Sequence, residues 1–156
     1  MKTTATSVVI LLAEDDEDDY RLTRDAFQEC RVLNDLRRVA DGEELMDYLY
    51  RRDAFSDPAK SPVPGLILLD LNMPKKDGRE CLRDIKADAA LRAIPIVVLT
   101  TSKAEEDVLR SYQLGVNSFI KKPVTFAGLV DAVQVFERYW FEIVDIPRVM
   151  QSRGAS

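Results

Sequence analysis

The chain has 156 residues, of which 46% are hydrophobic, and it carries a net charge of −5 at neutral pH. This length and composition predict one folded domain with a sizeable core and exclude a disordered chain. The negative charge argues against nonspecific binding of nucleic acid, and no apolar run is long enough to span a membrane, so we expect a cytoplasmic protein.

The sequence contains no histidine, which removes several classes of chemistry. Ser-His-Asp and Cys-His nucleophilic sites need an imidazole, as does a histidine phosphodonor, and the usual zinc ligand sets need histidine or more than the two cysteines present. Cys30 and Cys81 lie on the apolar sides of helical patterns, so we predict two buried free thiols. Any chemistry must therefore use carboxylates, hydroxyls and lysines.

Five strand patterns alternate with five helical patterns along the chain. Strands are predicted over residues 7–13, 36–40, 66–69, 94–99 and 116–120. Helices are predicted over residues 18–30, about 45–52, 79–88, about 108–115 with a stop at Gly115, and 125–139 or beyond. Residues 53–64 carry three prolines and are expected to form an exposed connection. The alternation predicts an α/β fold, a doubly wound five-stranded parallel sheet of flavodoxin-like order 2-1-3-4-5.

The apolar run over residues 66–69 has the form of a strand buried on both faces, and it stops at Asp70. Turn residues follow it, Met73-Pro74 and Asp77-Gly78, before the next helical pattern. Parallel α/β sheets bind ligands at the carboxyl ends of their strands, where we expect Asp70 to lie. Taken alone, this aspartate is equally well explained as a residue that caps the turn.

Glu14 and Asp15 follow the first strand, which neighbours the third strand in the predicted order. We therefore expect both side chains beside Asp70. Carboxylates 4 Å apart repel by about 4 kcal/mol per pair at an effective dielectric constant near 20, so a fold does not keep three of them together unpaired. The cluster must take up a proton or a hard divalent cation, and oxygen ligation with open positions for water suits Mg²⁺ or Mn²⁺.

Thr100 ends the fourth strand and Lys122 ends the fifth, so a hydroxyl and an ammonium should reach the same crevice. An acidic metal site flanked by these groups suits a phosphoryl group, whose oxygens the metal and lysine neutralise while a carboxylate attacks in line. The local alternatives are a hydroxyl bonded to its own turn and an ion pair of Lys122 with Asp70 or Asp15. The convergence of four strand ends favours the phosphoryl site over these alternatives taken together.

These motifs resemble the receiver domain of two-component response regulators. The resemblance covers residues 8–136 and rests on the acidic pair after the first strand, on DLNMPKKDG, on LTTS and on FIKKP. It implies the following roles: Asp70 as phosphoacceptor, Asp15 and Asp70 as direct Mg²⁺ ligands, Glu14 as a ligand through water, the Asn72 carbonyl as a further ligand, Lys122 as phosphoryl contact, and Thr100 with Phe119 as switch pair.

The resemblance also implies a mechanism and a partner. A sensor histidine kinase would transfer a phosphoryl group to Asp70, and the acyl phosphate would later hydrolyse, so the chain is a signalling protein and not an enzyme with its own substrate. In the family the Lys122-Pro123 peptide is typically cis. Phe119 stands where tyrosine is frequent, so we expect a read-out through packing.

Two further features concern carboxylates near the first strand. Glu14 stands where aspartate is commoner in the family, and its longer side chain can still hold a metal-bound water. We assign Asp16, Asp18 and Asp19 to helix N-terminal charge and solvation, with no role in the site.

Apolar residues cover two adjacent faces of the last helix and continue into the tail, whereas one stripe suffices to seal a sheet. With no output domain expected, we predict a homodimer through the fourth helix, fifth strand, fifth helix and tail; the alternative is a tail folded over its own domain. We expect a receiver domain over residues 1–147 and a flexible tail over 148–156.

The prolonged C-terminus and the proline-bearing loop look like those of small response regulators paired with cyanobacterial phytochromes. This narrower likeness implies a phytochrome kinase as partner.

The rival interpretation is a magnesium-dependent phosphatase or phosphotransferase with an aspartyl nucleophile, similar to the haloacid dehalogenase superfamily. Those enzymes usually place a second aspartate two positions after the nucleophile, where this chain has Asn72. A second rival is an interaction module that has lost phosphorylation, which the intact set of site residues disfavours.

Overall fold

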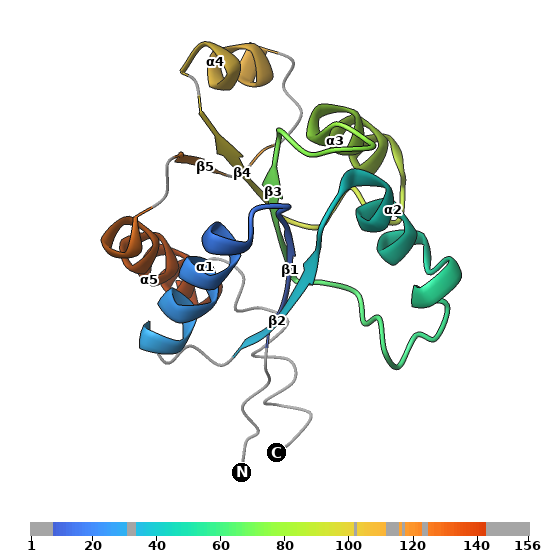
Figure 1. The fold of residues 1–156 in the computed structure, drawn as a ribbon, viewed down its shortest axis with the longest axis horizontal. Coiled ribbons are helices and arrows are strands. Elements are labelled where there is room, and N and C mark those ends of the chain that lie inside the picture. The colour runs from blue at the N-terminus through green and yellow to red at the C-terminus, as the bar shows by residue number, and fades with distance from the viewer. Residues whose placement is uncertain are drawn as a thin grey trace.

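Five parallel strands form one sheet in the computed structural model, which describes residues 8–30, 34–101, 103–111, 116, 118–122 and 125–142. The sheet order is β2-β1-β3-β4-β5, and every neighbouring pair is parallel, which confirms the predicted flavodoxin-like order (Figure 1). The strands are β1 (Val8–Ala13), β2 (Asn34–Val39), β3 (Leu66–Asp70), β4 (Ile96–Thr100) and β5 (Ser118–Lys121).

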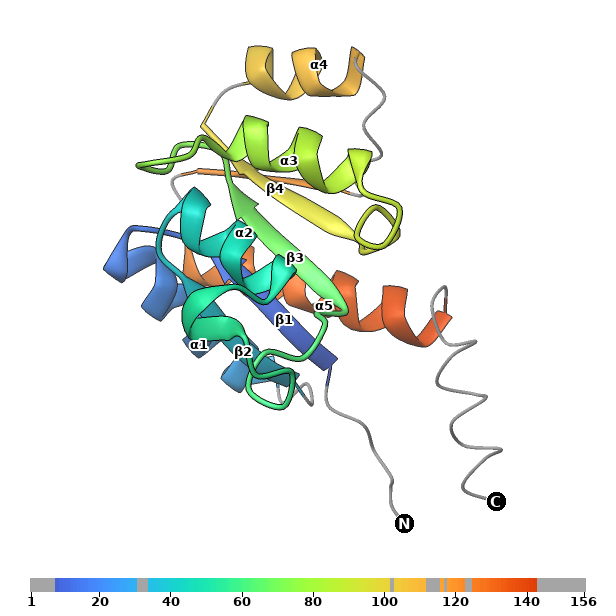
Figure 2. The ribbon, with the colours of Figure 1, turned by 90° about the vertical axis from the view of Figure 1, so that its right-hand side faces the viewer.

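Helices cover both faces of the sheet, as a doubly wound fold requires. They are α1 (Glu17–Cys30), α2 (Gly42–Tyr50), α3 (Gly78–Ala87), α4 (Lys103–Ser111) and α5 (Phe126–Glu142), with a short 3₁₀ helix, η1 (Asp53–Phe55). Figures 1 and 2 show α1 and α5 together on one face, α2 and α3 on the other, and α4 beyond the end of β4. None of the helices in the described part of the chain combines the length and apolar character needed to cross a bilayer.

Side chains of the central strands alternate between two apolar layers. Leu11, Ile67 and Val98 pack with α2 and α3, whereas Leu12 and Leu68 pack with α1 and α5. All residues of β3 and β4 are buried. Strands buried on both faces need continuous apolar runs, which is why the sequence predicted these two so readily.

Several boundaries differ from the predictions. The fourth helix, α4, begins at Lys103, five residues before the predicted 108, and β5 begins at Ser118, two residues after the predicted 116. β2 begins at Asn34, two residues earlier than expected, because polar residues of this edge strand pair with β1 through their backbone. β4 begins at Ile96, two residues later than expected. Pro95 has no N–H to donate, although its carbonyl accepts a hydrogen bond from Ile67 N. The predicted connection over residues 53–64 contains η1.

Several predictions fall outside the described residues. They concern the stop at Gly115, the Lys122-Pro123 peptide, the apolar side chains of α5 after residue 134, the tail after Glu142 and the domain limit at residue 147. These remain predictions.

Candidate functional site

An acidic cluster lies where β1 and β3 end side by side. Glu14 and Asp15 follow β1, Asp70 is the last residue of β3, and one carboxylate oxygen from each lies within 4.8 Å of the others. The pairing of β1 with β3 brings these positions together, since Ala13 is in register with Leu69. Glu14 and Asp70 are buried, whereas Asp15 is exposed at the rim.

The chain after Asp70 folds back tightly on the end of β3. Asn72 N donates to Asp70 Oδ1 at 3.1 Å, and Gly78 N donates to Leu71 O at 3.0 Å. A Cβ at Gly78 would lie 2.4 Å from the Asp70 carbonyl oxygen, a distance that backbone atoms cannot accommodate. Glycine is therefore needed at residue 78 for α3 to begin this close to Asp70.

Lys122 follows β5 and points into the cluster. Its Nζ lies 3.2 Å from Asp70 Oδ2, 3.1 Å from Glu14 Oε1 and 3.1 Å from Asp19 Oδ2. The backbone fixes its position, because Lys122 N donates to Thr100 O at 2.8 Å. The ion pair with Asp70, which the sequence left open as an alternative, is thus present alongside contacts with two further carboxylates.

Asp19 was wrongly assigned to helix solvation alone. It lies in the first turn of α1, its side chain is 21% exposed, and its carboxylate contacts Lys122. The sequence does contain a signal, because Asp19 heads the stripe of α1 that continues with the buried Thr23 and Phe27. Asp16 has the expected helix-end role, since its Oδ1 accepts from Asp19 N at 2.9 Å.

Burial and charge shift the proton affinities of the two groups at the centre. Burial, a shared hydrogen bond with Asp70 and repulsion from Asp70 raise the pKa of Glu14 to about 8, although Lys122 opposes the rise. Burial lowers the pKa of Lys122, but the carboxylates of Glu14 and Asp70 outweigh it and hold that pKa above its usual value. Burial beside Asp70 therefore favours the protonated form of Glu14.

The donor set fits a hard divalent cation. Glu14 Oε1 is buried and accepts no hydrogen bond from the described residues, although Lys122 Nζ makes an ion pair with it. Carboxylate oxygens from Glu14, Asp15 and Asp70 converge there, and the exposed Asp15 leaves the rim accessible to water. Oxygen donors with room for water are what Mg²⁺ and Mn²⁺ prefer.

Thr100 is the last residue of β4, and Phe119 is the second residue of β5. Thr100 is buried, and its hydroxyl donates to Glu105 Oε1 in the first turn of α4 at 2.8 Å. In this conformation the hydroxyl thus has the local bond that the sequence left as an alternative. Phe119 is half-buried against the apolar layer under α2 and α3, in register with Val98.

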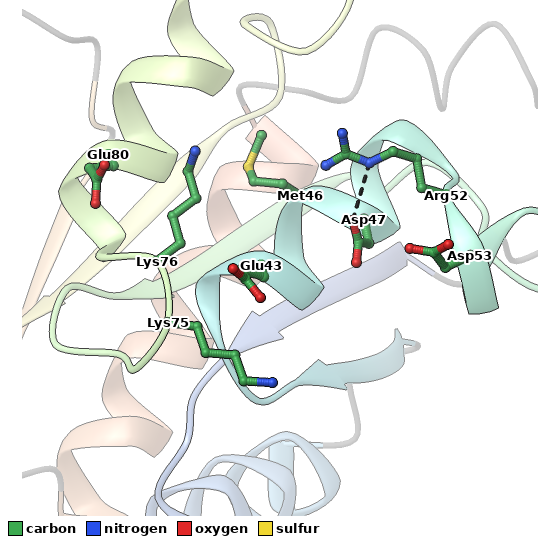
Figure 3. Close-up of a pocket in the computed structure, with 8 residues that line it drawn as sticks. All are labelled: Glu43, Met46, Asp47, Arg52, Asp53, Lys75, Lys76 and Glu80. Atoms are coloured by element: carbon green, nitrogen blue, oxygen red, sulfur yellow. Dashed lines mark hydrogen bonds and ion pairs between the residues drawn. The ribbon is translucent and has the colours of Figure 1, made fainter.

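A hollow of about 520 Å³ lies beside the loop that follows Asp70 (Figure 3). Both basic and acidic side chains line this hollow, and the Arg52 guanidinium forms an ion pair with Asp47 at 3.1 Å. This mixed lining differs from the acidic cluster, so the hollow does not offer a second metal-type site. It is lined by Glu43, Met46, Asp47, Arg52, Asp53, Lys75, Lys76 and Glu80.

The fold and the cluster together define a flavodoxin-like α/β protein with an acidic, metal-type site at the point where the strand order reverses. Residues 10–134 match the response regulator receiver domain. The chain therefore belongs to this family of two-component signalling proteins.

Similar proteins agree over nearly the whole chain. The response regulator Rcp1 of Synechocystis sp. is 43% identical over 139 residues, which cover 89% of this chain and 92% of Rcp1. The crystal structure of the phosphorylated cyanobacterial phytochrome response regulator RcpA matches with a TM-score of 0.74 at 41% identity, covering 88% of this chain and 96% of RcpA. The Mn²⁺-bound form of Rcp1 matches with a TM-score of 0.74 at 43% identity, covering 87% of this chain and 96% of that chain.

Proposed function

We propose that Asp70 accepts a phosphoryl group from the phosphohistidine of a sensor kinase and that the modification changes the surface formed by α4, β5 and α5. The observation that carries this proposal is the position of the Lys122 ammonium, which lies 3.2 Å from Asp70 Oδ2 and 3.1 Å from Glu14 Oε1, both of them buried carboxylates. A cation in that position neutralises the oxygens of a phosphoryl group bound to Asp70.

In the proposed reaction an oxygen of Asp70 attacks phosphorus, and the bond between phosphorus and the kinase imidazole breaks. The imidazole leaves with the electron pair, and Asp70 becomes an acyl phosphate, which water later hydrolyses. Lys122 neutralises the phosphoryl oxygens throughout. Mg²⁺, held by Asp15, Asp70, the Asn72 carbonyl and, through water, Glu14, would add positive charge beside the same oxygens. The Mn²⁺-bound structure of the similar Rcp1 supports a divalent cation in this role.

The proposed read-out uses Thr100 and Phe119. The Thr100 hydroxyl moves toward the phosphoryl group, and Phe119, already half-buried, packs into the space that Thr100 leaves. Because phenylalanine has no hydroxyl, this step changes packing alone. Two conformations of the α4, β5 and α5 surface then exchange, and phosphorylation shifts their populations.

Labelling with acetyl phosphate in the presence of Mg²⁺, followed by intact-protein mass spectrometry, tests the acceptor. Asp70→Asn should abolish labelling, whereas Asp84→Asn, which removes an exposed α3 carboxylate paired with Lys76, should label like wild type. Lys122→Ala should still accept some label, but its α4, β5 and α5 amide resonances should shift less. Undiminished labelling of Asp70→Asn would refute the proposal, and turnover of small phosphate esters would favour the phosphatase, for which the family match offers no support.

We propose a phytochrome-type histidine kinase as the partner and the cytoplasm as the place of transfer. The 41% identity to RcpA, described as a phytochrome response regulator, supports this choice. Phosphotransfer from a panel of purified kinases to this chain should be fastest from a red-light-sensing kinase. Faster transfer from unrelated kinases would overturn the assignment.

We also propose a homodimer through α4, β5, α5 and the tail, within a receiver domain that extends to residue 147. Val108 on α4 is 51% exposed and Phe126 on α5 is 40% exposed, so the helices that precede and follow β5 in the chain each present an apolar side chain to solvent. Sedimentation velocity should report about twice the chain mass of 17.7 kDa, and Val108→Asp should lower it. A monomer at high micromolar concentration would contradict the dimer.

A further inference from the structure

The hydroxyl of Thr100 is already committed before any phosphoryl group arrives. It donates to Glu105 Oε1 at 2.8 Å, and Thr100 is only 2% exposed, so water does not compete strongly for the hydroxyl. A hydroxyl carries one proton and donates to one acceptor at a time. Donation to Glu105 and donation to a phosphoryl oxygen on Asp70 therefore exclude each other.

Glu105 is held in turn by α3. Its Oε2 forms an ion pair with Arg79 Nη2, and Arg79 Nη1 lies 3.0 and 2.9 Å from the two carboxylate oxygens of Asp77. The planar guanidinium thus joins a carboxylate at the start of α3 to one at the start of α4. Because the side chain of Glu105 is only 18% exposed, solvent screens this contact less than it would an ordinary surface pair.

The anchor of this network lies against the backbone of Asp70. Asp77 caps α3 and accepts from Arg79 N at 2.7 Å, while the adjacent Gly78 is packed on the Asp70 carbonyl. One end of the network therefore packs against the backbone of Asp70, and the other end accepts a hydrogen bond from the Thr100 hydroxyl. Its members run in the order Asp77, Arg79, Glu105 and Thr100.

We propose that Glu105 is a positioning residue that holds the Thr100 hydroxyl in the resting conformation, with Arg79 fixing the orientation of its carboxylate. The hydrogen bond between Thr100 and Glu105 must then break each time the protein switches. The free energy that this requires lowers the population of the active conformation. This inference rests on the proposed phosphoacceptor role of Asp70. In this proposal one side chain of α4, Glu105, sets the equilibrium between the resting and the active conformation.

Two measurements on Glu105→Ala test the inference, with Glu106→Ala as matched control. Glu106 is in the same helical turn and pairs with the exposed Lys103, so its removal changes the net charge equally. The first measurement is the affinity for beryllofluoride in the presence of Mg²⁺, because beryllofluoride occupies a carboxylate as a phosphoryl mimic. The second is the set of amide chemical shifts of Thr100 and Phe119 in protein without metal or beryllofluoride.

Glu105→Ala should bind beryllofluoride about tenfold more tightly than wild type, because the competing acceptor is gone; tenfold corresponds to ~1.4 kcal/mol. Its metal-free amide shifts should move toward those of the loaded wild type. Glu105→Gln should fall between, since an amide oxygen still accepts from Thr100 but loses the ion pair with Arg79. In a Thr100→Ala background, Glu105→Ala should have no effect on affinity.

Equal affinities and equal metal-free shifts for Glu105→Ala and Glu106→Ala would overturn the inference, as would a full effect of Glu105→Ala in the Thr100→Ala background. These outcomes leave the proposed function intact, provided that the wild type binds beryllofluoride and Asp70→Asn does not. Failure of the wild type to bind it would instead refute the phosphoacceptor role of Asp70, and this inference with it.

Discussion

Lys122 and Asp19 form an ion pair of 3.1 Å that links the end of β5 to the first turn of α1. The same ammonium contacts Glu14 and Asp70, so one lysine has three carboxylate partners. A cation bound by Glu14 and Asp70 would compete with Lys122 for their charge. Asp19 is not one of the expected metal ligands, so its ion pair with Lys122 can persist when a cation binds Glu14 and Asp70. Asp19 thereby keeps the Lys122 ammonium next to the site.

Asp19→Asn should therefore weaken Mg²⁺ binding. Without Asp19 the ammonium stays on Glu14 and Asp70, where it opposes a second cation, and the pocket loses one negative charge. We expect the dissociation constant to rise about fivefold, or ~1 kcal/mol, for charges that interact near a protein surface. Isothermal titration of Mg²⁺ measures the change. The control is Asp18→Asn, an exposed carboxylate of the same turn, and an equal loss in both variants would contradict the role given to Asp19.

Stability of the metal-free protein should depend on the protonation of Glu14. Its pKa is about 8 in the folded protein and 4.5 without the fold, so between these values the folded state binds more protons than the unfolded state. The free energy of unfolding should consequently fall as pH rises from about 5 to 8, by up to ~1.4 kcal/mol per pH unit. Urea denaturation in the presence of a chelator measures this slope. Glu14→Gln should flatten it, and a wild-type slope no steeper than that of Glu14→Gln would contradict the prediction.

Mg²⁺ should raise the melting temperature of the wild type, since a ligand that binds only the folded state stabilises it. At one hundred times the dissociation constant the gain is about 2.7 kcal/mol. Asp15→Asn should lose most of this gain because it removes a predicted ligand. Asp25→Asn, which removes an exposed α1 carboxylate paired with Arg24, should keep it. Differential scanning calorimetry with and without Mg²⁺ makes the comparison, and equal shifts in both variants would remove the metal assignment of Asp15.

Gly78→Ala should destabilise the protein by about 2–4 kcal/mol, because the new Cβ would lie 2.4 Å from Asp70 O and neither backbone segment can yield cheaply. Gly128→Ala is the matched control in the first turn of α5. Its Cβ would meet only the side-chain oxygen of Thr125, at 2.9 Å, and this side chain can rotate aside at the cost of the cap hydrogen bond that it accepts from Gly128 N, a cost that the higher helix propensity of alanine offsets. Chemical denaturation should show a change of less than about 1 kcal/mol for that variant. Similar losses in both would show that the close approach at Gly78 is not the cause.

Most of the fold follows from local features of the sequence. The apolar runs of β1, β3 and β4 are continuous because both faces of a parallel sheet are covered, and this pattern can be read without coordinates. The edge strand β2 was placed less accurately, since the polar residues Asn34 and Asp35 pair with β1 through their backbone and give no apolar pattern in the sequence. The residues at the strand ends were predictable for the same reason as the strands: once the strand order is known, Glu14, Asp15 and Asp70 must share one edge.

The sequence by itself determined which strand ends carry carboxylates, a hydroxyl and an ammonium. Only the tertiary structure decided which of these groups pair, because a charged side chain on a helix surface has no local pattern that identifies its partner. Asp19 and Lys122 are far apart in the chain, and so are Arg79 and Glu105, yet each pair meets because strand ends and helix starts from different parts of the chain converge at one edge of the sheet. Hydrophobic periodicity encodes where the backbone goes, whereas charge pairing depends on distances that exist only after the backbone has folded.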